Sequence, residues 1–562
     1  MARYGLLCVG VWAAAVSVSA GDEEVWPAAK TNGRIYAECA RCAERILTGW
    51  LECKRDPETH LYSRGGEWNY QDEAADHYSS LVVMAHHLRP EWNEPGGALH
   101  TTLVQSVRLC TTENGLPARY DLQNKKRGAV DVSAIAEWLR DGLLRIAELL
   151  GTDNDYYREL TRLTDALLAE AERRGISSLL KDSEDEGNVL QVLARLAAMS
   201  GQTRYLEAAE SIADRYLLAD PLQKLASYNF VDHGCELVPG LSELFVIESK
   251  LNRPRARSYR EPLRRLLDRL LEVGRHPESG LWYCRANLQG DQPKQQGRPT
   301  KLKQPGISGA AFRPDVPHCW GYVLFAYENY DRATGENRYR AAVEKPMRWL
   351  VANQSRFDEL KNTQWPWNHS VGCFGDSYES MIILWNRYRE VPGVPEWLDW
   401  TTRVGGLRRE ADPRYGPGVG GHTDGCIGRA LCAHMMLQSH GVRAVPYQKG
   451  LSCGAVRHNG VLRLSVRSEQ AWSGRLCFDR PRNRHALATI DWARINELPQ
   501  WFVVEPSSVY EVRRDEMDSA HLRGDELIRG LEVQLQPGQC LRIEVAEIPR
   551  VNSQWWEKRV RP

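Results

Sequence analysis

Apolar residues recur at helical spacing along most of the chain, from about residue 30 to 440, with few alternating stretches. Spacing of three and four residues is typical of helices that bury one face in a common core. Alternation of apolar and polar residues begins after about residue 443, as in 460–466, 531–535 and 541–545. Alternating segments with turn residues between them predict antiparallel strands. The pattern therefore predicts a long helical part followed by a β-rich part.

Several junctions between the expected helices share one sequence pattern. Residues 197–210 read AAMSGQTRYLEAAE and residues 331–344 read DRATGENRYRAAVE, with a weaker copy at 150–157. The glycine is suited to end one helix with a positive φ, and the polar residue after it can cap the next helix. A repeated helical hairpin predicts that neighbouring hairpins stack and bury a shared core.

Counting the hairpins gives an inner and an outer set of helices. The inner helices are expected to begin near Asp72, Asp131, Glu186, Asp232, Asp315, Asp376 and Thr423. Their outer partners are expected near 31–52, 98–110, 155–174, 202–219, 257–273, 337–354 and 395–404. Six or seven pairs are enough to close a ring, and an open solenoid is the competing architecture. We predict a mainly α protein, with an (α/α)6–7 toroid over residues 21–442 followed by a C-terminal antiparallel β-sandwich with a tail over 443–562.

The first 20 residues have the pattern of a secretory signal. Arg3 supplies a positive charge, an apolar run follows over 4–18, and Val18-Ser19-Ala20 offers small residues ahead of a cleavage site. No later segment approaches about 18 uninterrupted apolar residues. We therefore expect a secreted or periplasmic protein with no membrane span after signal removal. One of the 14 cysteines, Cys8, lies in this signal, and the pairing of the others cannot be read from their spacing.

Composition adds a weak indication of the ligand. The net charge is zero at pH 7 and 42% of residues are apolar, so no basic bias points to nucleic acid. Trp is abundant, with 19 residues against 8 Phe, and indole rings both stack on sugars and fill cores. No HExxH, P-loop or GxSxG motif occurs, and no Gly-rich segment follows a predicted strand as the Rossmann fingerprint requires, which removes several enzyme classes. No His or Cys spacing argues for a metal, so no metal or cofactor is expected.

Candidate chemistry lies where the inner helices begin. A ring of hairpins gathers the N-termini of its inner helices around one mouth, where unpaired N–H groups attract anionic groups. Helix capping requires polar residues at the same places, so each candidate also has a purely structural explanation. The candidate catalytic residues are Asp232, His233, Glu236, Asp315, His318, Asp376 and Glu379. The candidate substrate-binding residues are Trp68, Asp72, Asp76, Tyr228, Trp320, Trp367, His369 and His422.

Spacing supports these candidates. Asp72 and Asp76 are four residues apart, which places them on one helix face, and the same holds for Asp232 and Glu236. One carboxyl group of such a set can act as an acid while a second carboxylate or a histidine acts as a base. The loop of about 285–312, rich in Gly, Pro, Lys and Gln, precedes the Asp315 region and is typical of a binding loop or a disordered segment.

The signal, the Gly-x-x-Arg-Tyr hairpin junctions, the helix starts rich in Asp, His and Trp, and the β-rich end together resemble the six-hairpin glycosidase-like enzymes. That group includes glycoside hydrolases, among them unsaturated uronyl hydrolases and arabinofuranosidases, and toroidal polysaccharide lyases. The resemblance covers most of the chain, but it lies in the architecture, and no motif selects one family. The zinc-binding cluster of adjacent cysteines expected of the arabinofuranosidase branch is not evident in the sequence.

The resemblance implies a carbohydrate substrate, and three functions remain open. Glycoside hydrolysis of poly- or oligosaccharides, including uronic-acid-containing ones, needs an acid and a base or nucleophile, which the many carboxylates can supply. A polysaccharide lyase or uronyl epimerase would instead use a tyrosine or histidine as base, with Arg313 facing the substrate carboxylate. A non-catalytic carbohydrate-binding protein would keep the aromatic residues without a working carboxyl pair. The number of carboxylates favours the hydrolase.

Overall fold

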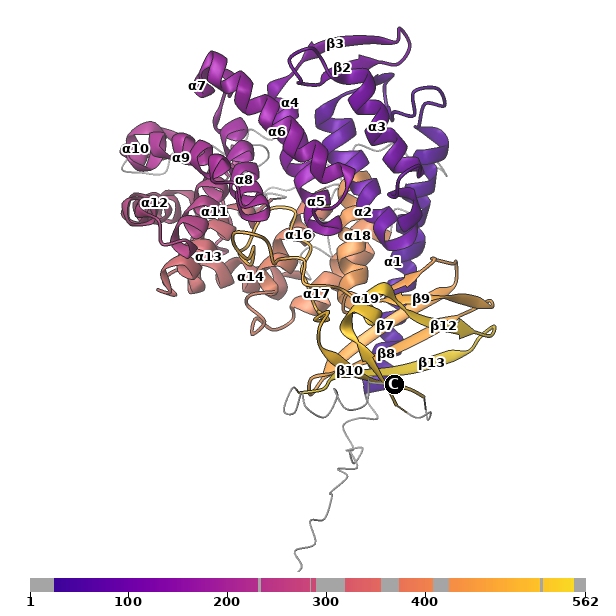
Figure 1. The fold of residues 1–562 in the computed structure, drawn as a ribbon. Helices are drawn as coiled ribbons and strands as arrows, with labels where there is room; N and C mark the ends of the chain where they lie inside the picture. The colour runs from indigo at the N-terminus through magenta and orange to yellow at the C-terminus, as the bar shows by residue number, and fades with distance from the viewer. Residues whose placement is uncertain are drawn as a thin grey trace, which may run out of the picture.

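The computed structural model describes residues 25–230, 234–283, 285–289, 319–354, 373–407, 424–515 and 519–549. The described residues form a helical body and a smaller β-rich part at one end of it (Figure 1). The prediction of a mainly α chain with a C-terminal antiparallel region is confirmed. Within the described part of the chain, the search for a helix long and apolar enough to cross a membrane finds none.

The described residues give seven helical pairs. The inner helices are η1 (Tyr70–Tyr78) with α2 (Ser79–Leu88); α4 (Val132–Glu137) with η3 (Trp138–Leu144) and α5 (Arg145–Leu150); α8 (Ser183–Ser200); α11 (Leu237–Lys250); α13 (Tyr322–Thr334); α16 (Cys373–Trp385); and α18 (Asp424–Gln438). The outer helices are α1 (Val25–Cys53), α3 (Ala98–Cys110), α6 (Asp155–Arg174), α9 (Thr203–Leu217), α12 (Pro254–Gly274), α14 (Arg340–Ala352) and α17 (Val394–Thr401). Short helices lie between them: η2 (Pro90–Trp92), α7 (Ile176–Leu179), α10 (Pro221–Lys224) and η6 (Thr402–Leu407).

The seven inner helices close into a ring. The last of them, α18, packs against the first, α2 and η1. The two backbones approach so closely that a Cβ atom on Gly425 would lie 2.1 Å from the carbonyl oxygen of Asp76. Between α13 and α16, the indole N–H of Trp320 donates to Ser377 Oγ at 3.0 Å. The closed ring confirms the toroid, and the open solenoid is excluded.

Inner and outer helices differ in burial, as their positions require. Every residue of α8 from Asp185 to Met199 is buried, because this helix has neighbours on all sides. The outer helix α9 buries one face only, including Tyr205, Leu206 and Ile212. A helix that is buried all round needs apolar or paired residues on every face, whereas an outer helix shows the usual apolar stripe.

The repeated junction has a structural role that its sequence indicated. Gly201 ends α8 with a φ of 75°, and Gly335 ends α13 with a φ of 72°, so both adopt the left-handed conformation. The tyrosine of each copy reaches back to the previous outer helix. Tyr205 donates to Asp165 at 2.8 Å and Tyr339 donates to Asp268 at 2.8 Å. The repeat thus ties successive outer helices together.

The β-rich part contains two antiparallel sheets in the described residues. Its elements are β6 (Arg443–Val445), β7 (Leu451–His458), β8 (Val461–Ser468), β9 (Trp472–Cys477), β10 (Val509–Arg514), β11 (Ala520–Arg523), α19 (Gly524–Arg529), β12 (Leu531–Leu535) and β13 (Cys540–Glu547). One sheet has the order β11-β10-β13-β8-β7 and the other β12-β9-β6. Their arrangement as a sandwich stays a prediction.

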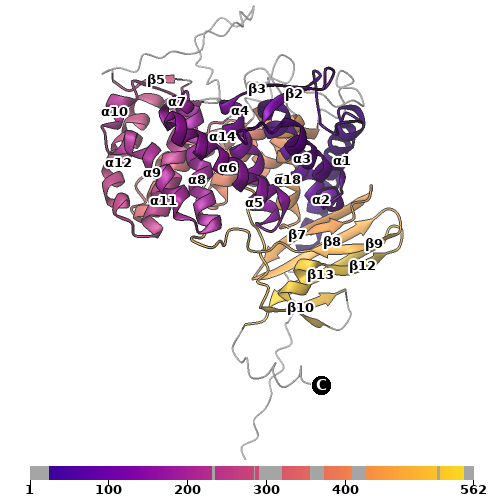
Figure 2. The ribbon, with the colours of Figure 1, turned by 45° about the horizontal axis from the view of Figure 1, so that its top comes forward.

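Two small sheets lie at the opposite end of the toroid, which Figure 2 shows at the top. They consist of β1 (Glu67–Trp68), β2 (Ala118–Asp121) and β3 (Lys126–Val130), and of β4 (Ser227–Asn229) paired with β5 (Arg285–Asn287). These short strands precede or connect inner helices, so this end is the mouth. The sequence did not predict them, because two to five residues are too few for a clear alternation.

Helix α1 joins the toroid to the β-rich part. It begins at Val25, earlier than the expected residue 31, and its first turns pack on β7 and β8. Two glycines permit this contact, since a Cβ on Gly454 would lie 2.1 Å from the backbone nitrogen of Gly33. The side-chain amide of Asn32 donates to the Ala455 carbonyl at 2.8 Å.

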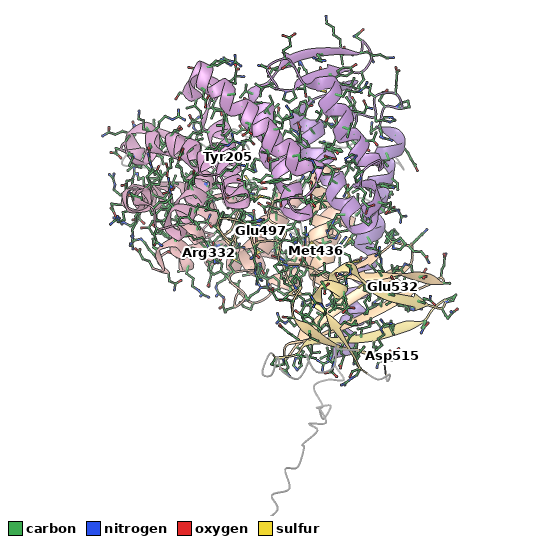
Figure 3. All side chains as sticks on the ribbon, viewed as in Figure 1. Tyr205, Arg332, Met436, Glu497, Asp515 and Glu532 are labelled. Atoms are coloured by element: carbon green, nitrogen blue, oxygen red, sulfur yellow. The ribbon has the colours of Figure 1, made fainter. Side chains whose placement is uncertain are left out.

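A second connection is the base segment, which we define as residues 491–497. It leaves the β-rich part and runs beneath the inner helices, where Figures 1 and 2 show it as a gold trace. Its Trp492 indole donates to Glu243 at 2.9 Å, and its Arg494 donates to Glu148 at 2.8 Å. Figure 3 labels Glu497 at the end of this segment, amid the helical body. The base segment therefore closes the end of the ring that faces away from the mouth.

Candidate active site

Seven of the predicted site residues lie outside the described residues. They are Asp232, His233, Asp315, His318, Trp367, His369 and His422. The structure describes the other eight, which are Trp68, Asp72, Asp76, Tyr228, Glu236, Trp320, Asp376 and Glu379. The latter separate into a buried aromatic set, a pair near the mouth and a central group of carboxylates.

The three described aromatic candidates are buried. Trp68 and Trp320 have no exposed surface and Tyr228 is 2% exposed. Trp68 packs edge-on against Tyr78, and the hydroxyl of Tyr228 donates to the Cys235 carbonyl at 2.7 Å. In this structure the three rings fill the core beneath the mouth, and none offers a face to a sugar.

Asp72 and Asp76 lie in η1, close to the mouth. Asn69, and not Asp72, caps this helix, because its side chain accepts from the backbone N–H groups of Asp72 at 2.8 Å and Glu73 at 3.3 Å. The Asp72 carboxylate forms an ion pair with Arg64 at 3.3 Å and is 38% exposed. Asp72 is therefore available to a ligand at the rim.

Asp376 and Glu379 come together on one cation. They lie in the first turns of α16, and Nη2 of Arg429 on α18 contacts Oδ1 of Asp376 at 2.6 Å and Oε2 of Glu379 at 3.0 Å. The hydroxyl of Tyr322, at the start of α13, donates to the same Glu379 oxygen at 3.4 Å. Three inner helices thus converge on this pair of carboxylates.

A second charged pair comes from η3. Nη1 of Arg140 contacts Oδ1 of Asp141 at 2.7 Å, and Nη2 of Arg140 contacts Oε1 of Glu236 at 3.5 Å. The Arg140 Nε donates to Oδ1 of Asn188 at 2.8 Å. Arg140 and Glu236 are both 3% exposed, whereas Asp141 is 15% exposed. Asp141 is therefore the member of this group that solvent reaches.

Asn496 of the base segment joins the two charged groups. Its backbone N–H donates to Oε1 of Glu379 at 2.5 Å. Its side-chain Nδ2 donates to Oδ1 of Asp141, and its Oδ1 accepts from Nη1 of Arg429. We call the joined set the central cluster, and it consists of Arg140, Asp141, Glu236, Asp376, Glu379, Arg429 and Asn496.

Burial sets the electrostatics of the central cluster. Removal from water raises the pKa of Glu379, the charge of Asp376 adds to this effect, and the Arg429 guanidinium opposes it. Burial also raises the pKa of Tyr322 well above its ordinary value, with contributions from Asp376 and Glu379. Arg145, which lies at the start of α5 beside the cluster, has its pKa lowered to about 10 by burial and by Arg429. The site thus contains a carboxyl group that keeps its proton to higher pH than usual.

Sequence reasoning did not select Arg140, Asp141, Arg429 or Asn496. For the first three a signal exists: each is a charged residue in the middle of an otherwise apolar inner helix, as in WLRDGLL and CIGRALC. Buried charges are costly and are kept where they are paired. Asn496 has no such signal, because its place depends on how the base segment returns to the toroid.

The part of the chain that the structure describes contains no group of three or more His, Cys, Asp or Glu residues arranged to hold a metal ion. The polar groups of the described site are bound to one another by hydrogen bonds and by the ion pairs of Arg140 and Arg429.

No protein-family model matches this sequence, and no curated protein matches it. Solved structures that match include glycoside hydrolases. The GH76A α-1,6-mannanase of Salegentibacter sp. HEL1_6, as an inactive variant in complex with α-1,6-mannotetrose, is 14% identical over 59% of this chain and 95% of its own, with a TM-score of 0.37. A GH8 xylanase from Teredinibacter turnerae, a catalytic mutant in complex with xylohexaose, is 11% identical over 63% of this chain and 97% of its own, with a TM-score of 0.31.

A GH127 β-L-arabinofuranosidase from Geobacillus stearothermophilus T6 is 12% identical over 92% of this chain and 75% of its own, with a TM-score of 0.24. These toroidal glycosidases belong to the group that the sequence resembles, and they come from three different families. They do not resolve the family of this chain.

Proposed function

We propose that this protein is a glycoside hydrolase that acts on a poly- or oligosaccharide with the carboxyl groups of the central cluster. One observation carries the proposal: Asp376 and Glu379 share the Arg429 guanidinium, and Asp141 from another inner helix is joined to the same guanidinium through Asn496. Glycoside hydrolysis uses two carboxyl groups that flank the scissile bond, and the central cluster brings carboxyl groups from two inner helices to one place.

The two sides of the central cluster have different properties, and acid–base catalysis needs that difference. On one side, Glu379 has a raised pKa, and it shares a cation with Asp376 three residues earlier. On the other side, Asp141 is ion-paired with Arg140 and accepts from Asn496. We assign proton donation to the leaving-group oxygen to Asp376, the more exposed member of the Asp376–Glu379 pair. We assign to Asp141 the role of the carboxylate that faces the anomeric carbon or its attacking water.

Access supports this assignment. Asp141 is 15% exposed and Asp376 is 19% exposed, although both lie within the ring of inner helices. The more deeply buried Glu379 and Glu236 are 7% and 3% exposed. Asp141 and Asp376 are therefore proposed to touch the substrate, and Glu379 and Glu236 to set the charge around them.

The described residues favour hydrolysis over a lyase or epimerase that uses tyrosine as its base. Burial raises the pKa of Tyr228 well above its ordinary value, and its hydroxyl is bound to the Cys235 carbonyl. Tyr322 is buried in the same way, beside two carboxylates. A base must be able to lose its proton near the working pH, and neither phenol meets that condition.

Secretion to the cell exterior or the periplasm remains part of the proposal, on the basis of the signal pattern of residues 1–20. Carbohydrate as the partner follows from the proposed reaction.

A panel of plant, algal and microbial glycans tests the function. The purified protein is incubated with each glycan, and new reducing ends are measured together with absorbance near 235 nm. Hydrolysis gives reducing ends without a rise in absorbance. A rise on a uronate polymer would identify a lyase instead, and binding without cleavage on every glycan would identify a non-catalytic protein.

A further inference from the structure

We propose that Asn496 is a positioning residue for the reaction, so that the C-terminal part of the chain completes an active site whose carboxylates all belong to the toroid. The inference rests on the proposed function and deepens it. It assigns a task to the base segment, which lies far from the inner helices in sequence.

The backbone N–H and both polar atoms of the Asn496 side chain form hydrogen bonds within the central cluster. Its N–H donates to Glu379, its Nδ2 donates to Asp141, and its Oδ1 accepts from Arg429. Arg145 also donates to Oδ1, at 3.5 Å. Because Oδ1 faces two guanidinium groups and Nδ2 faces a carboxylate, only one orientation of the amide satisfies its partners.

The backbone of Asn496 supports the same conclusion. Its φ is 66°, in the left-handed region that residues other than glycine adopt rarely, although asparagine tolerates it best. The residue is 3% exposed. Unusual backbone conformations persist where the surroundings fix them, and they gather at functional sites. Here the conformation aims the N–H at Glu379 and the side chain at Asp141 from one residue.

The side chain of Asn496 suits both sides of the cluster. Asp141 requires a donor, and Arg429 requires an acceptor. An aspartate at position 496 would place a third carboxylate against Asp141, and a leucine would leave both partners without their hydrogen bonds. A neutral amide provides a donor and an acceptor on one rigid plane.

The base segment is anchored independently of this contact. The side-chain amide of Asn329 on α13 donates to the Ala493 carbonyl at 3.0 Å. Arg195 on α8 donates to the Ile495 carbonyl at 3.3 Å. Because these anchors touch none of the cluster carboxylates, their strength can be changed separately from the chemistry of Asn496.

The charged groups around Asp141 determine how a substitution of Asn496 changes the protonation of the central cluster. Arg140 contacts Asp141 directly and also pairs with Glu236. Arg145 lies near Asp141 on α5, and Asn496 links Asp141 to Glu379 and Arg429. In Asn496→Asp the new carboxylate would add a negative charge beside Asp141 and Glu379 together. Ionised forms become less favourable there, so protons are held to higher pH.

The test compares Asn496→Asp and Asn496→Ala with the matched control Asn329→Ala, all in the full chain. On a glycan that the wild type cleaves, both Asn496 variants are expected to lose about 10- to 100-fold in kcat with little change in KM. The acidic limb of the kcat profile of Asn496→Asp is expected to move up by about one pH unit. Asn329→Ala is expected to lower Tm while keeping the wild-type profile. The positioning role would be overturned if Asn496→Asp kept the wild-type kcat and pH profile. It would also be overturned if Asn329→Ala changed kcat and the pH profile as much as Asn496→Asp does.

A second measurement separates this inference from the proposed function. The Tm of Asn496→Asp, relative to wild type, is measured from pH 4 to 8 without any glycan. The introduced carboxyl group would face Arg429 and Arg145 on one side and the Asp141 carboxylate on the other. Because two carboxyl groups in contact do not readily ionise together, this pair is expected to hold one proton to higher pH, and the variant should lose stability progressively as the pH rises. If the wild type cleaves no glycan, the proposed function fails, while this titration still decides whether Asn496 lies between the carboxylates. A pH-independent difference in Tm would show that it does not.

Discussion

The guanidinium of Arg429 on α18 binds the carboxylate of Asp376 on α16 at 2.6 Å, across the gap between the sixth and seventh inner helices. The same nitrogen of Arg429 also contacts Glu379 at 3.0 Å. One cation therefore serves two carboxyl groups in a largely buried place. Arg429 therefore affects both the stability of the fold and the protonation of the two carboxyl groups.

We predict that Arg429→Met destabilises the protein by about 3–5 kcal/mol, because it leaves the buried Glu379 and the partly buried Asp376 without their cation. The pKa of Glu379 is raised by burial and would rise further without Arg429. A group with a raised pKa in the fold contributes stability below its unfolded pKa and loses it as the pH rises. The deficit of the variant should therefore grow from pH 4 to pH 8. Urea unfolding across this range measures it.

The exposed Arg513→Met on β10 serves as the matched control, since Arg513 is 44% exposed. A loss below about 1 kcal/mol for Arg429→Met, equal to that of the control, would contradict a buried role.

A second pH effect is expected away from the site. Glu248 at the end of α11 faces Glu210, and burial together with this neighbour raises the pKa of Glu248 to about 8. Its contribution to stability is present below the unfolded pKa of about 4.5, and it is lost as the pH rises through about 8. We predict that Glu248→Gln flattens the fall of the unfolding free energy between pH 5 and pH 8. The slope should change by no more than about 1.4 kcal/mol per pH unit.

Unfolding curves in urea at pH 5, 6, 7 and 8 check this, with the exposed Glu532→Gln as control. Parallel curves for wild type and Glu248→Gln would show that Glu248 is ionised throughout.

The contact between α1 and β7 is expected to tolerate no side chain. In Gly454→Ala the new Cβ would lie 2.1 Å from the carbonyl oxygen of Ala29. Both partners are backbone, so neither can move alone, and overpacking of this kind costs about 1–3 kcal/mol or more. Gly65→Ala is the control, because nothing lies within 4 Å of its Cβ position. Thermal unfolding should separate the two variants clearly, and equal Tm values would mean that the contact is loose.

Much of the fold could be predicted from the sequence, because local patterns determine it. The expected outer helices at 98–110 and 155–174 agree with α3 and α6, and the glycines of the repeat end α8 and α13 as expected. The expected start at Asp131 was one residue from the start of α4, because Asp131 caps that helix through Ser133. Each of these features depends on residues close together in the chain.

The site was predictable only in part. Asp376 and Glu379 were selected from their place at a helix start, and the structure brings them together on Arg429. Their partners Asp141 and Asn496 come from the second inner helix and from the base segment. Contacts between residues so far apart in the sequence depend on the closure of the ring and on the path of the C-terminal part of the chain. Trp68 and Trp320 are buried, and their role in binding a sugar stays a prediction, because an indole ring is as suited to a core as to a ligand.

The carboxylates of the toroid are proposed to hydrolyse a glycan. Release of reducing ends by wild type, Asp376→Asn and Asp141→Asn, measured side by side on the glycan panel with Glu532→Gln as control, tests it most directly. We predict hydrolysis by the wild type and the control, with kcat/KM lowered about 100- to 10,000-fold in both aspartate variants while they remain folded. Wild-type activity in either folded variant, or no release of reducing ends by the wild type from any glycan, would contradict the claim.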